Sequence, residues 1–315
     1  MDIPAIDQSK KRLKALKELN IINEEYVEKL INDYDQFKSM VINVRVYHDT
    51  LSLTLNLEFD SPIIIHWGDV MNLKVKDSKG LKHTYKKSGD YKIYINGNVT
   101  SFGGCGDSLI SVESYGDLPL KKLNFMNSSF LESIPDYIPE TVTDLSHMFD
   151  GIENFHLFED LRNLDFNTLN VDDMSYMFAN TGFNIPFLDF DTSNVKKMVG
   201  MFQNARGMRK IIRLNTQNVE DMSYMFADNE DFSSNLVFDT RNVKKMVGMF
   251  ENTSFNILDL HLNFDTQNVE DMSYMFRNTQ YFDGVLKFKI NEDTNLTGMF
   301  ETPYGFDMSN WHPYY

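Results

Sequence analysis

The chain has 315 residues, a formal net charge of −16 and one cysteine. Its length allows two or three domains, and a composition of 42% hydrophobic and 24% charged residues excludes wholesale disorder. The whole excess of acid lies within residues 131–315, which disfavours nucleic acid as a partner and also keeps a long exposed surface soluble.

The single thiol, Cys105, limits the covalent chemistry of the chain. It allows neither an intramolecular disulfide nor a thiolate zinc site, so we expect a small residue in a Gly-Gly-Cys-Gly turn. Residues 1–20 contain no apolar segment of a secretion signal, and no run approaches the length that spans a bilayer. The sequence therefore predicts no membrane insertion.

Residues 1–40 are predicted to form a helical anchor. Leu13, Leu16 and Leu19 give one short apolar helix face, and Asn23 is placed to cap a second helix. Residues 13–30 resemble the SHOCT helix pair, and this resemblance implies a short oligomerising or anchoring element. Two interpretations stay open, because the pair could dock on a larger partner or pack on the domain that follows.

Residues 41–100 have the pattern of β-strands. Strict alternation predicts one half-buried strand, and 62–67 and 91–95 predict further strands. The alternating residues are Leu51, Leu53, Leu55, Leu57 and Phe59. The Trp67-Gly68-Asp69 turn, the His83-Thr84-Tyr85 segment and the following Gly89-Asp90-Tyr91 resemble PKD domains. This resemblance implies a small immunoglobulin-like β-sandwich that serves as a spacer or adhesive module. His83, Asp69 and Asp90 lack metal-ligand spacing, so we interpret them as turn and core-edge residues.

An internal repeat dominates residues 101–315. The pair Met-Phe recurs at spacings of 29, 24, 24, 24, 26 and 24 residues, within the pattern F-D-T-x-N-V-x-x-M-x-x-M-F. The pairs begin at Met148, Met177, Met201, Met225, Met249, Met275 and Met299. One such unit cannot bury its own apolar face, so stacked units must share a continuous core.

Each unit is predicted to hold a brief strand and then a short helix. The strand would carry the apolar column Phe166, Phe190, Leu214, Phe238, Phe264 and Phe288. An Asn would then accept a backbone N–H as the helix cap, at Asn170, Asn194, Asn218, Asn242 and Asn268. Val, Met, Met and Phe at i, i+3, i+6 and i+7 give one buried helix face, which is core and not a cofactor site.

A second period of about 48 residues lies over the first. A charged pair alternates in sign along the units: Asp172-Asp173, Lys196-Lys197, Glu220-Asp221, Lys244-Lys245 and Glu270-Asp271. Equivalent positions of stacked units lie about 4.8 Å apart, so the alternation predicts an ionic ladder that sets the register.

The residue before each Met-Phe pair alternates between a large and a small side chain. The series is Tyr176, Gly200, Tyr224, Gly248, Tyr274 and Gly298. The tyrosines are candidate protein-binding residues, because Tyr is enriched at binding hot spots. The alternative is that each Tyr packs over a Gly between units.

The units resemble those of BspA-like surface proteins, a leucine-rich-like family rich in N-V-x-x-M-x-x-M-F. Residues 114–149 resemble the entry segment of that family, with Tyr115-Gly116-Asp117-Leu118 in place of its usual Trp-Gly-Asp-Leu. The resemblance covers about residues 100–300. It implies a protein-interaction or adhesion module without catalytic residues.

The sequence predicts no enzyme. It contains no nucleophile elbow, Walker loop, dinucleotide fingerprint or zincin motif, and its paired carboxylates recur with the repeat. We therefore expect neither cofactor nor metal. The expected fold is mainly β with short helices: a helical anchor at 1–40, a PKD-like β-sandwich at 41–100 and a leucine-rich-repeat-like solenoid with caps at 101–315.

The resembling families and the missing export signal together predict a structural, decoration or host-attachment protein in the virion of a bacterial virus. Residues 1–40 would bind other virion proteins, oligomers are allowed, and the repeats would project towards a host surface receptor. The alternative is a bacterial cell-surface or cytoplasmic interaction or adhesion protein. The aromatic tail Trp311–Tyr315 would cap the open end of the array or contact a neighbouring subunit.

Overall fold

A computed structural model describes residues 38–69, 73–76, 81–152, 166–182, 191–206, 214–230, 232, 236–255, 262, 264–280, 286 and 289–301. Within these ranges the protein is mainly β, with ten strands, one short 3₁₀ helix η1 (Gly106–Ser108) and no α-helix. None of these residues forms a helix that is long and apolar enough to cross a membrane. The predicted N-terminal helix pair lies outside the described residues.

A five-stranded sheet holds most of the strands and has the order β5-β4-β7-β1-β9. Within it, β1 (Met40–Val46) lies between β7 (Gly89–Asn96) and β9 (Leu109–Ser114) and is antiparallel to both. On the other side, β4 (Ile63–His66) joins β7 to β5 (Leu73–Val75). Alternate apolar side chains of β1, β4 and β7 are fully buried, together with Trp67 and Tyr85. Because β9 belongs to this sheet, the sheet continues past residue 100, where the sequence predicted a domain boundary.

The alternating run of residues 51–59 forms two strands with different partners. β2 (Ser52–Leu55) pairs antiparallel with β6 (Leu81–Thr84), whereas β3 (Leu57–Phe59) pairs with β8 (Val99–Phe102). The break falls at Asn56, whose carbonyl accepts the N–H of Gly103 at 2.7 Å and whose N–H donates to the Gly104 carbonyl at 3.1 Å. The other edge of β8 pairs parallel with β10 (Lys122–Leu123).

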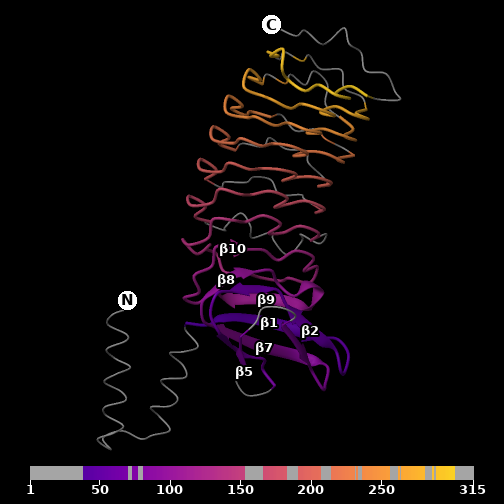
Figure 1. The fold of residues 1–315 in the computed structure, drawn as a ribbon. Helices are drawn as coiled ribbons and strands as arrows, with labels where there is room; N and C mark the ends of the chain where they lie inside the picture. Colours follow the sequence, from indigo (N-terminus) through magenta and orange to yellow (C-terminus); the bar gives the residue numbers. More distant parts are fainter. Residues whose placement is uncertain are drawn as a thin grey trace, which may run out of the picture.

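From β10 onward the repeat units lie side by side in a parallel ladder (Figure 1). Single bridges join Lys122, Asp144, Asp173, Lys197, Asp221, Lys245, Asp271 and Asn295 in turn. We call the six residues that begin at each bridged position a rung: 144–149, 173–178, 197–202, 221–226, 245–250, 271–276 and 295–300. In every rung but the last, the N–H groups at positions 2, 4 and 6 donate to carbonyls of the next rung at 2.7–3.0 Å.

The short helices predicted for the repeat are absent from the described units. Each rung instead makes successive tight turns; the N–H of Met201, for example, donates to the Met198 carbonyl at 3.3 Å. Position 4 has a positive φ in every rung, and a left-handed residue ends a right-handed helix. The N–H groups that a helix would use along the chain therefore bond across to the next rung.

The brief strand predicted around the Phe of F-D-T is reduced to isolated bridge residues in the described units. Phe166, Leu214 and Phe264 are buried and Phe238 is half-buried, but none of them lies in a strand. Phe190 and Phe288 lie outside the described residues. The regular series of backbone bridges occurs at position 1 of each rung, and near the apolar column a single parallel bridge joins Leu262, two residues before Phe264, to Leu286.

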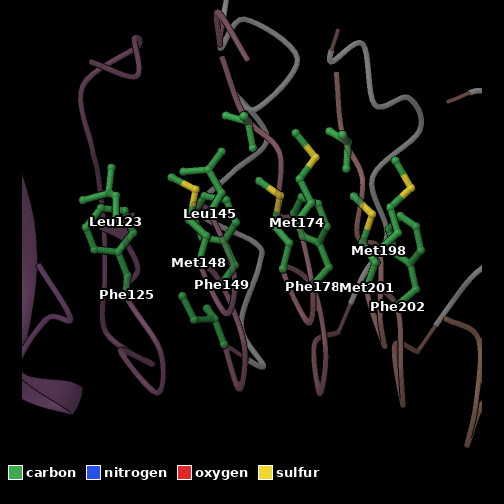
Figure 2. Packing of buried hydrophobic residues seen from close by; sticks show 14 of the residues in the cluster. Leu123, Phe125, Leu145, Met148, Phe149, Met174, Phe178, Met198, Met201 and Phe202 are labelled. Carbon is green, nitrogen blue, oxygen red and sulfur yellow. The ribbon is translucent and has the colours of Figure 1, made fainter. Parts of the chain in front are cut away.

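Methionine and phenylalanine columns form the core of the ladder (Figure 2). The Met at positions 2 and 5 and the Phe at position 6 are 0% exposed in every rung from 173 to 276. Consecutive Phe rings stack with centroids 5.5–5.8 Å apart from Phe149 to Phe300. The column continues back through Phe125 to Phe102 of β8, so the sheets and the ladder share one hydrophobic core.

Candidate functional site

Position 4 of the rungs forms a column of residues with left-handed backbone. It holds His147, Tyr176, Gly200, Tyr224, Gly248, Tyr274 and Gly298, with φ between 56° and 61°. Glycine adopts this conformation freely, whereas a tyrosine there is uncommon and needs support from its surroundings. The alternation seen in the sequence therefore lies at the most constrained backbone position of the rung.

Each tyrosine of this column lies over the glycine of the next rung. A Cβ placed on Gly200 would be 2.3 Å from Cε1 of Tyr176, and the equivalent distances are 2.5 Å for Gly248 and Tyr224 and 2.6 Å for Gly298 and Tyr274. Only a residue without a side chain leaves room for the ring. The structure thus shows the Tyr-over-Gly packing that the sequence offered as one alternative.

The outer parts of the same rings remain accessible. Tyr176, Tyr224 and Tyr274 are half-buried, and within the described part of the chain their hydroxyl groups have no hydrogen-bond partner. The His147 ring stacks on Tyr176 at 4.8 Å and 10°, and the Arg277 guanidinium lies 4.6 Å from the Tyr274 ring. Burial of the ring raises the pKa of the Tyr176 hydroxyl, so this hydroxyl stays protonated at neutral pH.

The charged pairs line the ladder at position 1 and just before it. Asp173, Lys197, Asp221, Lys245 and Asp271 follow one another as bridged residues. Their neighbours Asp172, Lys196, Glu220, Lys244 and Glu270 are exposed. Two ion pairs join adjacent units within these ten residues, Lys197 with Asp173 at 3.3 Å and Lys244 with Glu220 at 2.6 Å. The Lys244 ammonium lowers the pKa of the Glu220 carboxyl.

Lys197→Glu is expected to lower the melting temperature, because position 1 of three successive rungs would then carry carboxylates. The loss should shrink in 1 M salt, which screens exposed charges. Thermal unfolding at two salt concentrations measures both effects. Lys82→Glu, on an exposed position of β6, makes the same charge change outside the ladder. Equal melting temperatures for the two variants would contradict a role of the charged column in stability.

The asparagines that were predicted to accept hydrogen bonds as helix caps donate hydrogen bonds instead. Their side-chain amides donate to a carbonyl of the preceding unit at 2.6–2.8 Å. These residues are Asn170, Asn194, Asn218, Asn242 and Asn268. Because the amide can donate as well as accept, the period identified the residues but not the direction of their bonds.

Two further polar columns were not predicted. A buried Thr of each unit donates its hydroxyl to a carbonyl of the next unit, at Thr168, Thr192, Thr216, Thr240 and Thr266. Two residues after each of the five rungs from 173 to 276, a left-handed Asn or Asp recurs, at 180, 204, 228, 252 and 278. The side-chain amide of Asn204 bonds to Asn180 and that of Asn252 to Asp228. The signal was the 24-residue period together with the tolerance of Asn for left-handed backbone.

His83, Asp69 and Asp90, which the sequence predicted to be turn and core-edge residues, do not meet at one point. His83 Nε2 contacts the Asp69 carboxylate at 2.9 Å and stacks on Trp67, whereas Asp90 pairs with Arg45. Among the described residues no three His, Cys, Asp or Glu side chains are grouped to hold a metal ion. The half-buried Cys105 thiol has its pKa raised to about 12 by burial, which makes it a poor nucleophile.

The geometry is that of a mainly β protein whose repeats form a parallel ladder. Each rung of this ladder ends in a Met-Phe pair. The model of the family described as "Mycoplasma protein of unknown function, DUF285" matches residues 120–237 and 207–311, which together cover more than half of the chain. The chain belongs to this family. No curated protein and no solved structure matches the chain.

Proposed function

We propose that the chain is a non-enzymatic interaction protein that binds a partner protein along the tyrosine column. The supporting observation is the packing and the hydrogen bonding of three tyrosines, Tyr176, Tyr224 and Tyr274. Each ring is fixed over a glycine, and each hydroxyl is without a partner in the described part of the chain. Rings that are already ordered lose little conformational entropy on binding, and a free hydroxyl can add a hydrogen bond.

The spacing of the column suits an elongated partner. Successive tyrosines lie two rungs apart, which corresponds to about 10 Å at the usual distance between strands. The units that carry these tyrosines also carry the acidic pairs of the charged column, whereas the units between them carry the lysine pairs. An extended partner whose basic groups recur at the spacing of the tyrosine-bearing units therefore fits the column best.

The finer fold assignments belong to the same proposal. We propose that the ladder is a solenoid of BspA-like, leucine-rich-like units and that the preceding sheets form a PKD-like β-sandwich. The shared hydrophobic core and the parallel bridges support the first assignment. The antiparallel five-stranded sheet, with Trp67 and Tyr85 in its core, supports the second.

For the setting in which the protein acts, the family description names Mycoplasma, and this favours the bacterial interaction protein of the two settings that we considered. The virion setting stays a prediction. Fractionation of the source culture into virus particles, envelope and cytosol, followed by cross-linking, separates these settings. A constant ratio of the chain to one protein of virus particles would favour the virion.

Binding is expected to depend on the tyrosines together. A variant with Tyr176, Tyr224 and Tyr274 each changed to Ser should lose most of its cross-linked partner. The matched control is Tyr94→Ser on β7, which removes a half-buried tyrosine outside the ladder. Melting curves show whether the triple variant stays folded, and a Tyr→Phe triple variant keeps the packing over glycine. A folded serine variant that retains its partner in full would overturn the proposal.

A further inference from the structure

The three tyrosines of the column differ in what covers the ring on the side away from its glycine. The His147 ring stacks on Tyr176 at 4.8 Å and 10°. The guanidinium of Arg277 lies 4.6 Å from the ring centroid of Tyr274. No ring and no cation in the described part of the chain contacts the Tyr224 ring. The middle tyrosine therefore lacks the planar nitrogen group that covers each of the other two.

Arg277 shows how a guanidinium fits between two tyrosines of the column. Both its Nε and its Nη2 donate to Oε1 of Glu251, which directly follows the preceding rung. The guanidinium therefore lies on the side of the Tyr274 ring that faces this preceding rung. A Cβ placed on Gly248 of the same rung would be 2.9 Å from Oε2 of Glu251, so the carboxylate lies beside the glycine that Tyr224 covers. The chain thus supplies its own cationic ligand to Tyr274.

The unit with the middle tyrosine lacks this internal ligand. Ala227 directly follows its rung, at the position of Arg277. Gln203 directly follows the rung before it, at the position of Glu251. Gln203 reaches across to the next unit as Glu251 does, since its Nε2 donates to the Asp228 carboxylate at 2.9 Å. Its Oε1, which corresponds to a carboxylate oxygen of Glu251, accepts no hydrogen bond from the residues that the structure describes.

The spacing of the rungs is the same at both places. Tyr176 and Tyr224 are two rungs apart, as are Tyr224 and Tyr274, and each ring leans over the glycine of its next rung. Two rungs correspond to about 10 Å at the usual distance between strands. A planar group between two rings needs about 7–8 Å, because each contact takes about 3.5–4 Å. The space between Tyr176 and Tyr224 can therefore accept a guanidinium, as the equivalent space before Tyr274 already does.

The charge around this space favours a cation. Asp221 begins the rung of Tyr224, Asp228 follows two residues after that rung, and neither forms an ion pair with a described residue. From the described residues, Asp228 accepts hydrogen bonds only from neutral side-chain amides, which leave its negative charge in place. Burial of the ring raises the pKa of the Tyr176 hydroxyl, and the charge of Asp221 adds to this effect. The Asp221 carboxylate is thus close enough to act on the tyrosine column.

We propose that Tyr224 binds an arginine side chain of the partner protein. The guanidinium lies on the ring face that is directed towards rung 197–202 and donates a hydrogen bond to Oε1 of Gln203. Arg277 is the internal template for this contact. Arginine suits the site better than lysine, because a planar guanidinium stacks on the ring and donates a hydrogen bond in its own plane. The inference rests on the proposed binding function of the tyrosine column and assigns one side chain of the partner.

Titration of the full chain with two short peptides, followed by NMR, tests the site directly. The probes are the peptide Ser-Gly-Arg-Gly-Ser and the same peptide with lysine in place of arginine. The arginine peptide should shift the ring signals of Tyr224 and the amide signal of Gly200 saturably, with an affinity about tenfold higher than that of the lysine peptide. Because one contact binds weakly, the titration extends to about 20 mM peptide. Equal affinities for the two peptides, or no shift at Tyr224, would overturn the proposal.

A variant that carries its own guanidinium at this site gives a second test. Ala227→Arg combined with Gln203→Glu copies the pair of Arg277 and Glu251 into the earlier unit. The new guanidinium should occupy the face of the Tyr224 ring and weaken the binding of the arginine peptide by more than about tenfold. A folded variant that binds the peptide at Tyr224 as tightly as the native chain would contradict the site.

The matched control is Ala179→Arg, which adds an arginine at the same position of the first tyrosine unit. There the His147 ring already covers Tyr176, and the new side chain belongs to a rung two rungs before that of Tyr224. Binding of the arginine peptide at Tyr224 should therefore stay within about twofold of the native value. A loss equal to that of the variant with Ala227→Arg would show that added positive charge alone repels the peptide, and the proposal would fall.

Cross-linking of the natural partner separates this inference from the binding function on which it rests. Loss of the partner by the Ala227→Arg, Gln203→Glu variant as well as by the serine variant of the three tyrosines would support the arginine site. Loss by the serine variant alone would leave the tyrosine column as the binding surface and overturn the arginine site. Retention of the partner by both variants would overturn the binding function itself, and the arginine site with it.

Discussion

Phe226→Ala is expected to lower the free energy of unfolding by about 3–5 kcal/mol, the usual cost of deleting a large buried ring. Phe226 is fully buried in the middle of the phenylalanine column. Its ring stacks on Phe202 and Phe250, each at 5.7 Å, and meets Phe232 edge-on at 5.1 Å. The neighbouring rungs are fixed by backbone hydrogen bonds on both sides, so they cannot collapse fully into the cavity.

Urea denaturation followed by circular dichroism measures this loss. Phe226→Leu, which keeps most of the volume, should cost much less, and Phe130→Ala should cost almost nothing because Phe130 is 50% exposed. Since units of a repeat array interact mainly with their neighbours, the variant should unfold its central rungs first. Similar losses for Phe226→Ala and Phe130→Ala would contradict the assignment of the phenylalanine column as the core.

The repeat shows which part of this fold can be predicted from the sequence. The Met-Phe period located every rung from 144 to 300, and the apolar identity of positions 2, 5 and 6 identified the core. These features follow from burial alone, because a unit of 24 residues has to share its apolar face with its neighbours. The core of the ladder could therefore be predicted before any coordinates.

The hydrogen-bond topology could not be predicted in the same way. Apolar residues at i, i+3, i+6 and i+7 fit a helix face, but they fit successive turns equally well. The deciding feature is the left-handed backbone at position 4, and Tyr176 and Tyr224 conceal it because tyrosine rarely adopts this conformation. In the alternate rungs, Gly200 and Gly248 did indicate a left-handed backbone at position 4. The apolar pattern nevertheless favoured a helix.

The sequence identified the residues of the candidate site but not the orientation of their side chains. The 48-residue period identified Tyr176, Tyr224 and Tyr274 as a column, since a side chain that recurs at every second unit lies on one line. Whether the rings point outward or cover the glycines depends on φ at position 4 and on the separation of the rungs. Both are properties of the assembled ladder and not of one unit.

Gly200→Ala is expected to destabilise the protein through two separate effects. The first is backbone strain, because φ is +56° at this position and an L-residue pays roughly 1–2 kcal/mol in left-handed conformation. The second is steric, because the new Cβ would lie 2.3 Å from Cε1 of Tyr176 and the ring would have to leave its position over the backbone. The sum should approach about 2–3 kcal/mol, a large single-site effect for the removal of no existing contact at a buried glycine.

Gly106→Ala isolates the first of these effects. Gly106 has a similar φ of +63°, but a Cβ added there would meet its nearest atom only at 3.9 Å. Chemical denaturation should therefore show a smaller loss for Gly106→Ala than for Gly200→Ala. In a Tyr176→Ala background, the cost of Gly200→Ala should fall to the level of the Gly106 variant, because only the backbone term is left. A cost that is unchanged by removal of the Tyr176 ring would show that this ring does not pack on Gly200, and the support for a pre-ordered tyrosine column would be lost with it.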